Sequence, residues 1–532
     1  MGRILSLLVL SAWLLTACGE NLWGEAGDLG TVPPQSGMPL AAATPTLPGR
    51  MATASPVPIQ SPAPSLTTDQ PTAAPSSTPA STPTLSTASQ PPPFLYESQS
   101  GDDLSVVAVH FGVPPSDIAS SSPLPQTGFI DPGTPLVIPD RLGVTSPTTH
   151  IIPDSEVVYS PTAVDFDVVG YVNSAGGTLS TYSEYLVGPG WLSGGGVVQQ
   201  LALESSINPR LLLAYIQYKT GWVTGPALPG VDPKLPLGYT NPPGYTGLYE
   251  QMRLLVQQLA TGYYGWRSGK LTTLRFPNGY QLRLNPTLNA GTVALQYLFS
   301  QYYNYDDWLK VIDPNSGFMA LYTQMFGDPF ERAATVEPLF PAGLNQPTFT
   351  LPFEIGALWA LTGGPHAAWE DETVLAAMDF APASGVSGCA PSDAWEVAVA
   401  PGLVVRSSDS YVLLDLNGEG YEETGWVVLY MHVADKDRVP VGTWVNAGDH
   451  IGHPSCLGGE ATGTHLHIAR KYNGEWVGAG GPIPFVMDGW TPHNGAAPYE
   501  GTLTKGNQTI IADSGATRES QIIRTPVPSP TP

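Results

Sequence analysis

The stretch Gly463-Thr464-His465-Leu466-His467-Ile468-Ala469-Arg470 places two imidazoles two residues apart within a short apolar run. Successive side chains of a β-strand point to opposite faces, so residues i and i+2 share a face. His465 and His467 can therefore address one point in space. Such a pair suits a zinc ion, or one metal ligand beside one base. A lone H-x-H pair is also typical of a solvated strand face, so the rest of the chain must decide.

Histidines concentrate near this pair. Of the nine in the chain, seven follow residue 360: His366, His432, His450, His453, His465, His467 and His493. This concentration favours a metal or acid–base site in the C-terminal third. The same region contains short β-type runs broken by Gly, Asp and Asn, at 396–400, 403–406, 411–414, 426–432 and 465–469. We expect an antiparallel β-rich domain there.

Four motifs in this region occur in a fixed order. They are Gly363-Gly364-Pro365-His366, Ala377-Met378-Asp379-Phe380, Leu429-Tyr430-Met431-His432 and the closing Gly463-Thr464-His465-Leu466-His467. Together they resemble the M23 family of zinc metallopeptidases, the lysostaphin-like endopeptidases of bacterial cell walls, over residues 350–500. The resemblance implies one zinc ion held by His366, Asp379 and His467. It also implies that His432 and His465 orient the attacking water and the scissile carbonyl.

The spacing of the first two ligands departs from the family pattern. The family has a compact H-x3-D, whereas twelve residues separate His366 from Asp379. An insertion that loops outward would keep the pair together, and Asp371 or His453 is the alternative to His366 as ligand. Nearby, Asp415 begins a run of alternating oxygen donors like the first half of a calcium loop. Trp426 stands at its twelfth position, so a polar hairpin turn is the favoured interpretation.

The N-terminus has the pattern of an export signal. Met1-Gly2-Arg3 precedes an apolar run from Ile4 to Leu15, which is too short for a permanent membrane span. The following Leu15-Thr16-Ala17-Cys18 resembles a bacterial lipobox. This implies that residues 1–17 are a signal peptide and that Cys18 is diacylated. The mature chain would then be lipid-anchored to the bacterial cell membrane, extracytoplasmic and facing the cell wall. In an exported protein, the remaining Cys389 and Cys456 are candidates for a disulfide.

Two further modules precede the histidine-rich region. Residues 18–93 are rich in Pro, Ser and Thr and are expected to form a disordered stalk. Residues 94–140 contain Ser100-Gly101-Asp102-Asp103-Leu104 and close with Pro132-Gly133-Thr134-Pro135-Leu136-Val137-Ile138-Pro139. They resemble a LysM module, which implies a small βααβ fold that binds peptidoglycan glycans. The asparagine usual after the second helix is replaced by the serine run 120–122.

Residues 158–345 show helix-type apolar periodicity, as at 207–216, 249–259 and 290–298. Asn208-Pro209 is typical of a helix start. The pattern resembles lysozyme-like glycan-cleaving domains, but Gln217-Tyr218-Lys219-Thr220 occupies the place of the catalytic glutamate. Glycoside cleavage needs a carboxylic acid there. We therefore expect a mainly α, lysozyme-like but inactive domain.

Composition limits the function further. A net charge of -24 and a pI near 4.5 argue against nucleic acid and anionic membrane surfaces as partners. With 58 Gly and 56 Pro, the chain should be multidomain, ending in a tail at 501–532. The leading prediction is a cell-surface zinc endopeptidase that cuts peptide cross-bridges of peptidoglycan. The alternative is a non-catalytic peptidoglycan-binding lipoprotein that regulates other cell-wall hydrolases.

Overall fold

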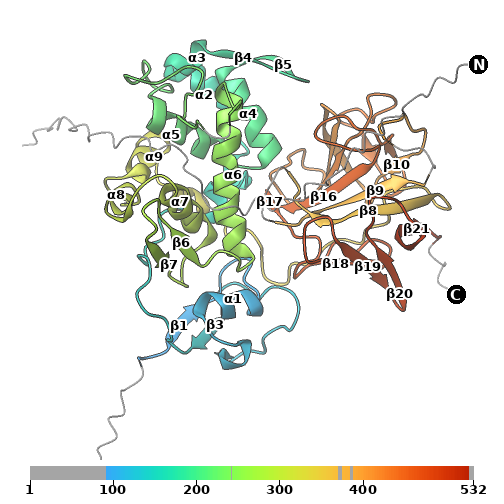
Figure 1. The fold of residues 1–532 in the computed structure, drawn as a ribbon, viewed down its shortest axis with the longest axis horizontal. Coiled ribbons are helices and arrows are strands. Elements are labelled where there is room, and N and C mark those ends of the chain that lie inside the picture. Colours follow the sequence, from blue (N-terminus) through green and yellow to red (C-terminus); the bar gives the residue numbers. More distant parts are fainter. Residues whose placement is uncertain (1–90, 241–242, 370–373, 384–387, 527–532) are drawn as a thin grey trace, which may run out of the picture. The chain divides into compact units, whose positions relative to one another are not determined.

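The computed structural model describes residues 91–240, 243–369, 374–383 and 388–526 (Figure 1). The predicted signal peptide, the lipidated Cys18 and nearly all of the stalk lie outside this range and stay predictions. From Pro92 onward, the described residues belong to one compact unit. Among the described helices, none is long and apolar enough to cross a membrane.

The LysM-like segment forms a three-stranded sheet beside one helix. Its elements are β1 (Phe94–Glu97), α1 (Leu104–Phe111), the 3-10 turn η1 (Pro115–Asp117), β2 (Ala119–Ser120) and β3 (Pro135–Ile138), with strand order β1-β3-β2. Asp103 caps α1 by accepting the Ser105 and Val106 N–H groups. The expected second helix is wrong: only the single turn η1 forms. The chain instead enters strand β2 at Ala119, two residues after η1 ends.

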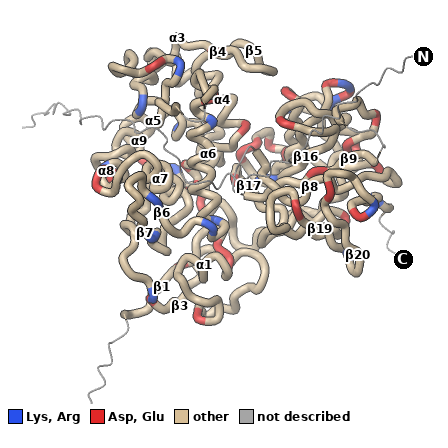
Figure 2. The backbone as a smooth tube through the Cα atoms, in the orientation of Figure 1, with Lys and Arg blue, Asp and Glu red and all other residues tan. Residues whose placement is uncertain are grey.

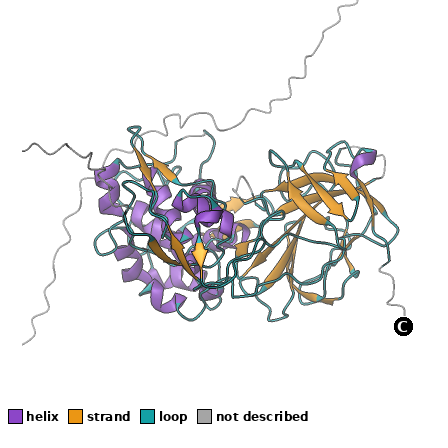
Figure 3. Ribbon diagram, turned by 90° about the horizontal axis from the view of Figure 1, so that it is seen from below, coloured by secondary structure: helices purple, strands orange, loops and turns teal. Residues whose placement is uncertain are grey.

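The middle of the chain is mainly helical, as expected, and Figure 3 shows its helices in purple. The helices are α2 (Val168–Ala175), α3 (Thr178–Thr181), α4 (Gly194–Ser205), α5 (Pro209–Thr220), α6 (Leu248–Arg267), α7 (Ala290–Ser300), α8 (Tyr305–Val311), α9 (Phe318–Phe326) and α10 (Pro329–Ala333). Two hairpins join them, β4 (Ser183–Leu186) with β5 (Gly190–Ser193) and β6 (Thr273–Arg275) with β7 (Gln281–Arg283). Asn208 caps α5 by accepting the Arg210 N–H, with Pro209 in the first turn. The predicted helix start is confirmed.

A nine-stranded sheet follows, and its paired strands are antiparallel. Its order is β14-β11-β12-β13-β16-β9-β8-β21, and β17 pairs with β16 off this path. The strands are β8 (Leu358–His366), β9 (Ala377–Pro382), β11 (Gly402–Ser408), β12 (Tyr411–Asp415), β13 (Trp426–Met431), β14 (Trp444–Val445), β16 (Leu466–Tyr472), β17 (Glu475–Trp476) and β21 (Gln521–Ile523). A smaller pair joins β10 (Glu396–Val397) to β15 (His450–Gly452). The five expected strands are all present, with ends shifted by a few residues.

The predicted C-terminal tail at 501–532 is wrong in its first part. Strands β18 (Thr491–Asn494), β19 (Gly501–Lys505) and β20 (Gln508–Ile511) form a three-stranded sheet, labelled near the C-terminal end in Figure 1. Strand β21 then pairs with Leu358–Ala360 of β8. Because β21 completes the edge of the large sheet, the β-rich domain continues beyond residue 500.

Acidic side chains outnumber basic ones throughout the protein, 45 to 21. Figure 2 shows many red and few blue positions along the β-rich domain. A net negative charge of this size repels polyanions, and the absence of a nucleic-acid partner stays a prediction.

Candidate metal centre

Neighbouring strands of the large sheet deliver the three predicted ligands. Asp379 on β9 lies directly opposite His467 on β16 and, on its other side, opposite Gly363 on β8. The pairing of β8 with β9 shifts register twice, between Leu361 and Gly363 and between Gly363 and His366. Such irregularities bend a strand and change the direction in which its side chains point. His366 and Asp379 therefore lie on paired strands, β8 and β9. The twelve residues between them in the sequence do not keep the two side chains apart.

One atom from each side chain converges on a common point. His366 Nε2 lies 3.0 Å from His467 Nδ1, and each of these nitrogens lies 3.3 Å from Asp379 Oδ1. All three residues are buried, with 2 %, 7 % and 7 % exposure for His366, Asp379 and His467. Their ligand atoms lie within 4.8 Å of one another. The structure therefore brings together the three residues that the sequence singled out.

The outer nitrogens of both imidazoles are held by backbone carbonyls. His366 Nδ1 donates to Gly364 O at 2.8 Å, and His467 Nε2 donates to Ala368 O at 3.2 Å. In the neutral rings, this leaves lone pairs on His366 Nε2 and His467 Nδ1 that point at each other. Asp379 Oδ1 is buried beside them, 3.3 Å from each of the two nitrogens. Two imidazole nitrogens and a carboxylate oxygen fit a zinc ion, and carbonyl-bound outer nitrogens are typical of histidine ligands.

The ionisation of these groups is compatible with a bound cation. Burial lowers the pKa of His366, but the adjacent Asp379 carboxylate outweighs burial, and the pKa is raised. Burial raises the pKa of Asp379, yet the charge and hydrogen bonds of His366 and His467 hold it well below its usual range. Burial lowers the pKa of His467. The Asp379 carboxylate therefore keeps its negative charge despite burial, and either protonated His366 or a bound cation can balance it.

The other two predicted histidines lie beside this cluster. The ring centroids of His432 and His465 are 4.4 Å apart, and His465 Nε2 lies 3.7 Å from Asp379 Oδ1. His432 Nδ1 donates to Leu457 O and His465 Nδ1 donates to Gly463 O, both at 2.7 Å. When neutral, each ring keeps a lone pair on Nε2. Burial lowers the pKa of His432 to about 3, with His465 and His467 adding to the effect, so its neutral form can accept a proton.

His432 has an unusual backbone for a non-glycine residue. Its φ is +69°, in the left-handed region, directly after β13 ends at Met431. Such conformations cost about 1–3 kcal/mol and cluster at functional sites. The conformation turns the chain out of the strand at the point where the ring meets His465.

The alternative ligands do not join the cluster. His453 Nδ1 donates to Ala394 O, and its ring contacts Trp395, as does the ring of His450. Asp371 lies outside the described residues. Asp415 accepts the N–H groups of Asn417 and Gly420, which fits the polar hairpin interpretation of that loop.

The structure joins Cys389 and Cys456 in a disulfide. Leu457, next to Cys456, provides the carbonyl that holds His432. On the other side of the bond, Thr464 donates its N–H to Gly388 O at 3.0 Å and its hydroxyl to Ala390 O at 2.6 Å. The disulfide therefore links Cys456, beside the carbonyl that holds His432, to Cys389. The residues on either side of Cys389 in turn hold Thr464, which precedes His465.

Tyr499 was missed by the sequence analysis. Its ring stacks on that of His366, with centroids 4.1 Å apart and planes 19° from parallel. Its carbonyl accepts the Gly364 N–H at 2.7 Å. Nothing in the local pattern marks this residue, because its role depends on the pairing of the last strands with β8.

A Gly363→Ala substitution is expected to lower zinc affinity by about 10- to 100-fold, the range seen when groups around a metal ligand are disturbed. A Cβ at this position would lie 2.5 Å from Asp379 Oδ2, so the carboxylate must move. Competition with a chromophoric chelator measures the affinity. Gly143→Ala is the matched control, because its Cβ would meet nothing within 4 Å. Equal affinities for the two variants would contradict the expectation.

Replacing both cysteines by serine is expected to reduce turnover while leaving one zinc per chain. The bond spans 67 residues, and loop closure of that length contributes about 4 kcal/mol to the free energy of unfolding. Denaturant unfolding, zinc stoichiometry and peptide hydrolysis measure the three effects. Loss of zinc from the double variant would show that the disulfide supports the ligands rather than His432 and His465.

Comparisons with known proteins find two likenesses in sequence. The family described as "LasA, N-terminal domain" matches residues 150–339. Protease LasA of Pseudomonas aeruginosa, from two strains, is 24 % identical over 353 residues, which cover 61 % of this chain and 74 % of the relative. The family match falls on the helical domain that was expected to resemble lysozyme. The likeness found there is to LasA instead.

Solved M23 structures resemble parts of the chain. The metalloprotease pseudoalterin is 21 % identical, covers 31 % of this chain and 96 % of its own, and has a TM-score of 0.27. The catalytic domain of lysostaphin from Staphylococcus simulans is also 21 % identical, covers 23 % and 87 %, and has a TM-score of 0.17.

Proposed function

We propose that this protein is an M23-type zinc metallopeptidase that hydrolyses peptide cross-bridges of peptidoglycan. The observation that carries the proposal is the convergence of His366 Nε2, His467 Nδ1 and Asp379 Oδ1, with both outer imidazole nitrogens held by carbonyls. The similarity to Protease LasA supports a peptide bond as the target. The four ordered motifs of the sequence support the same family.

His366, Asp379 and His467 would hold the zinc ion. When bound, zinc lowers the pKa of water and polarises a carbonyl oxygen. The rings of His432 and His465 lie 4.4 Å apart, and each keeps a lone pair on Nε2 when neutral. One of these nitrogens takes a proton from the attacking water, and the resulting N–H can donate to the developing oxyanion or pass its proton to the leaving amine.

We also propose the cellular setting that the sequence predicts. Cys18 would carry the lipid anchor on the extracytoplasmic side of a bacterial membrane, and the stalk would set the reach towards the wall. The LysM-like module would hold the glycan near the peptidase. Linking a weak glycan binder to the enzyme raises the local concentration of substrate. The non-catalytic alternative has less support, because all three candidate metal donors and both additional histidines are present.

Mass spectrometry of peptidoglycan fragments tests the proposal. Zinc-loaded full-length protein is incubated with purified peptidoglycan. New amino and carboxyl ends within the peptides are expected, and they should disappear with a chelator and return with zinc. Intact peptides in every sample, despite one bound zinc per chain, would contradict peptidase activity and favour the regulatory alternative.

A further inference from the structure

The β4–β5 hairpin of the helical domain has an apolar outer face. Tyr185 and Trp191 lie directly opposite each other on the two strands, and they are 59 % and 73 % exposed. Val187, two residues beyond Tyr185 and next to the tip, is 94 % exposed. Figure 1 shows the hairpin extending from the helical domain. Large apolar side chains that gather on one exposed face often mark a binding site.

The inner face of the same hairpin is fixed to the helices. Glu184 Oε2 accepts the backbone N–H groups of Leu248 and Tyr249, at 2.9 and 3.1 Å, in the first turn of α6. Leu192 packs against the core of the helical domain. Successive side chains of a strand point to opposite faces. The attachment of the inner face therefore holds the aromatic pair, Tyr185 and Trp191, outward.

The two rings of the aromatic pair form a corner. Their centroids lie 5.8 Å apart, and their planes differ by 67°. A sugar ring can rest its apolar C–H face on one aromatic ring and an edge against the other. The exposed Ser183 and Ser193 are paired across the same two strands, so their hydroxyl groups and that of Tyr185 border the corner. Aromatic faces beside neutral hydroxyl groups suit a saccharide.

Charge and size argue against other classes of partner. No Lys or Arg occurs between Arg141 and Arg210, so the hairpin has no cation for the phosphates of anionic lipid or nucleic acid. A stable protein–protein interface buries about 800 Å² on each partner. Three apolar side chains on a two-stranded hairpin offer much less than that. A sugar chain, which needs contacts for only one or two rings, fits the available surface.

A short series of contacts connects the hairpin to the candidate metal centre. A Cβ at Gly188, in the tip, would lie 2.9 Å from Asp409 Oδ1 in the turn between β11 and β12. A Cβ at Gly458 would lie 2.8 Å from Asp409 O in the same turn. The neighbouring Leu457 O accepts the hydrogen bond from His432 Nδ1. A polymer that rests on the hairpin would therefore pass close to the loop that holds His432.

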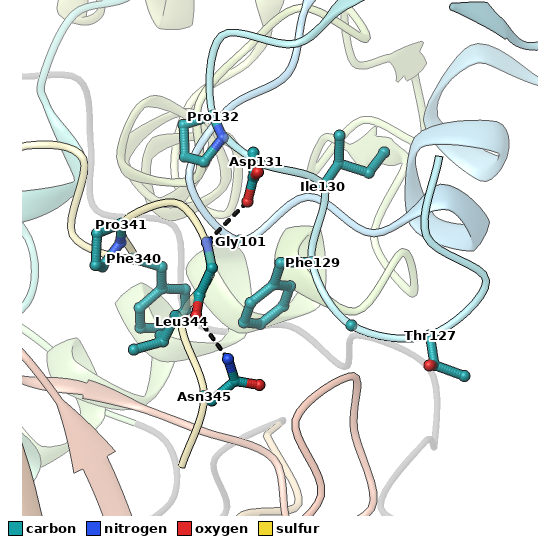
Figure 4. A pocket seen from close by; sticks show the side chains of 12 residues that line it. Gly101, Thr127, Phe129, Ile130, Asp131, Pro132, Phe340, Pro341, Leu344 and Asn345 are labelled. Atoms are coloured by element: carbon teal, nitrogen blue, oxygen red, sulfur yellow. Dashed lines mark hydrogen bonds between the residues drawn. The ribbon is translucent and has the colours of Figure 1, made fainter. Parts of the chain in front are cut away.

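The LysM-like module offers a more restricted surface. A pocket of about 170 Å³ lies between residues 127–132 of the module and residues 340–345, which belong to the connector between α10 and β8 (Figure 4). The Gly343 N–H of the connector donates to Asp131 Oδ1 at 2.8 Å. The connector therefore occupies part of the polar surface of this pocket, whereas the outer face of the hairpin is open to solvent.

We propose that the outer face of the β4–β5 hairpin binds the glycan strands of peptidoglycan, with an N-acetylated amino sugar in the corner between Tyr185 and Trp191. The choice of polymer rests on the proposed function, and the site itself rests on the geometry of the hairpin. Stem peptides of a strand held there would lie near the loop that positions His432. The hairpin would thus bind the part of the substrate that the metal centre does not cut.

Sedimentation with peptide-free glycan strands tests the site, because a peptidase cannot cut this polymer. The full-length, zinc-loaded Tyr185→Ala/Trp191→Ala protein is expected to bind at least about fivefold more weakly than the wild type. Trp191→Phe should keep most of the affinity, since it keeps an aromatic face. Tyr280→Ala is the matched control, because Tyr280 is a 44 % exposed tyrosine beside the other hairpin of the helical domain. Circular dichroism checks that all variants are folded.

Three results would overturn the proposal. The first is equal glycan binding by the double variant and Tyr280→Ala, which would leave glycan binding to another part of the chain. The second is no glycan binding by the wild type. The third is binding to phosphatidylcholine vesicles that the double variant loses while its glycan binding stays unchanged, which would assign the hairpin to a lipid surface.

Hydrolysis separates this inference from the proposed function. The double variant should raise KM for intact peptidoglycan several-fold, and much less for a soluble cross-bridge peptide that carries no sugar. An equal rise in KM for both substrates would contradict a glycan site. If the wild type hydrolysed neither substrate, the proposed peptidase would be wrong, and the sedimentation result would still decide whether the hairpin binds glycan.

Discussion

The His467→Ala protein is expected to bind no zinc at concentrations that saturate the wild type, and to lose peptide hydrolysis by roughly four orders of magnitude or more. His467 supplies one of three converging donor atoms, and its backbone pairs directly with Asp379. Without it, Asp379 and His366 would have to hold a cation alone. A carboxylate and one imidazole leave too few ligands for a protein zinc site.

Zinc-induced stabilisation measures this loss independently of activity. Zinc that binds only the folded wild type should stabilise it by about 2.7 kcal/mol at a hundredfold excess over Kd. The variant should show no such increase. His493→Ala is the control, because His493 is exposed and its Nε2 contacts the Thr504 hydroxyl, away from the cluster. An unchanged zinc effect in His467→Ala would exclude His467 as a ligand.

Local sequence patterns predicted much of the candidate site. The alternation in 465–469 placed His465 and His467 together, and the structure has both near Asp379. Asn208-Pro209 predicted the start of α5 because capping depends on adjacent residues. These successes share one property: the information lies within a few residues of the chain.

Long-range pairing could not be predicted in the same way. That β9 lies between β8 and β16 is what makes the long spacing from His366 to Asp379 acceptable. The carbonyls of Gly364 and Ala368 select the imidazole tautomers, but a backbone group leaves no signature in a sequence. Tyr499 and β21 were missed because their contacts are with β8, more than a hundred residues earlier.

The His432→Asn protein is expected to keep one zinc per chain and to lose hydrolysis by about 10²- to 10⁴-fold, the usual contribution of a general acid–base group. Asparagine tolerates the left-handed backbone at φ +69° better than alanine, so the substitution adds little strain. It removes the Nε2 base while leaving the three proposed ligands in place. Zinc stoichiometry and kcat/KM, measured on the same preparation, separate the two effects.

The pH dependence of the activity lost in His432→Asn shows whether His432 acts as a base or as a metal ligand. Burial lowers the pKa of His432 to about 3, so the wild-type ring is neutral throughout pH 5 to 8. The ratio of wild-type to His432→Asn activity should therefore be constant over that range. If His432 were instead a ligand, the variant would lose zinc along with activity, and added zinc would restore part of the rate. A constant ratio with zinc retained would assign proton transfer to His432, leaving His366, Asp379 and His467 as the metal donors.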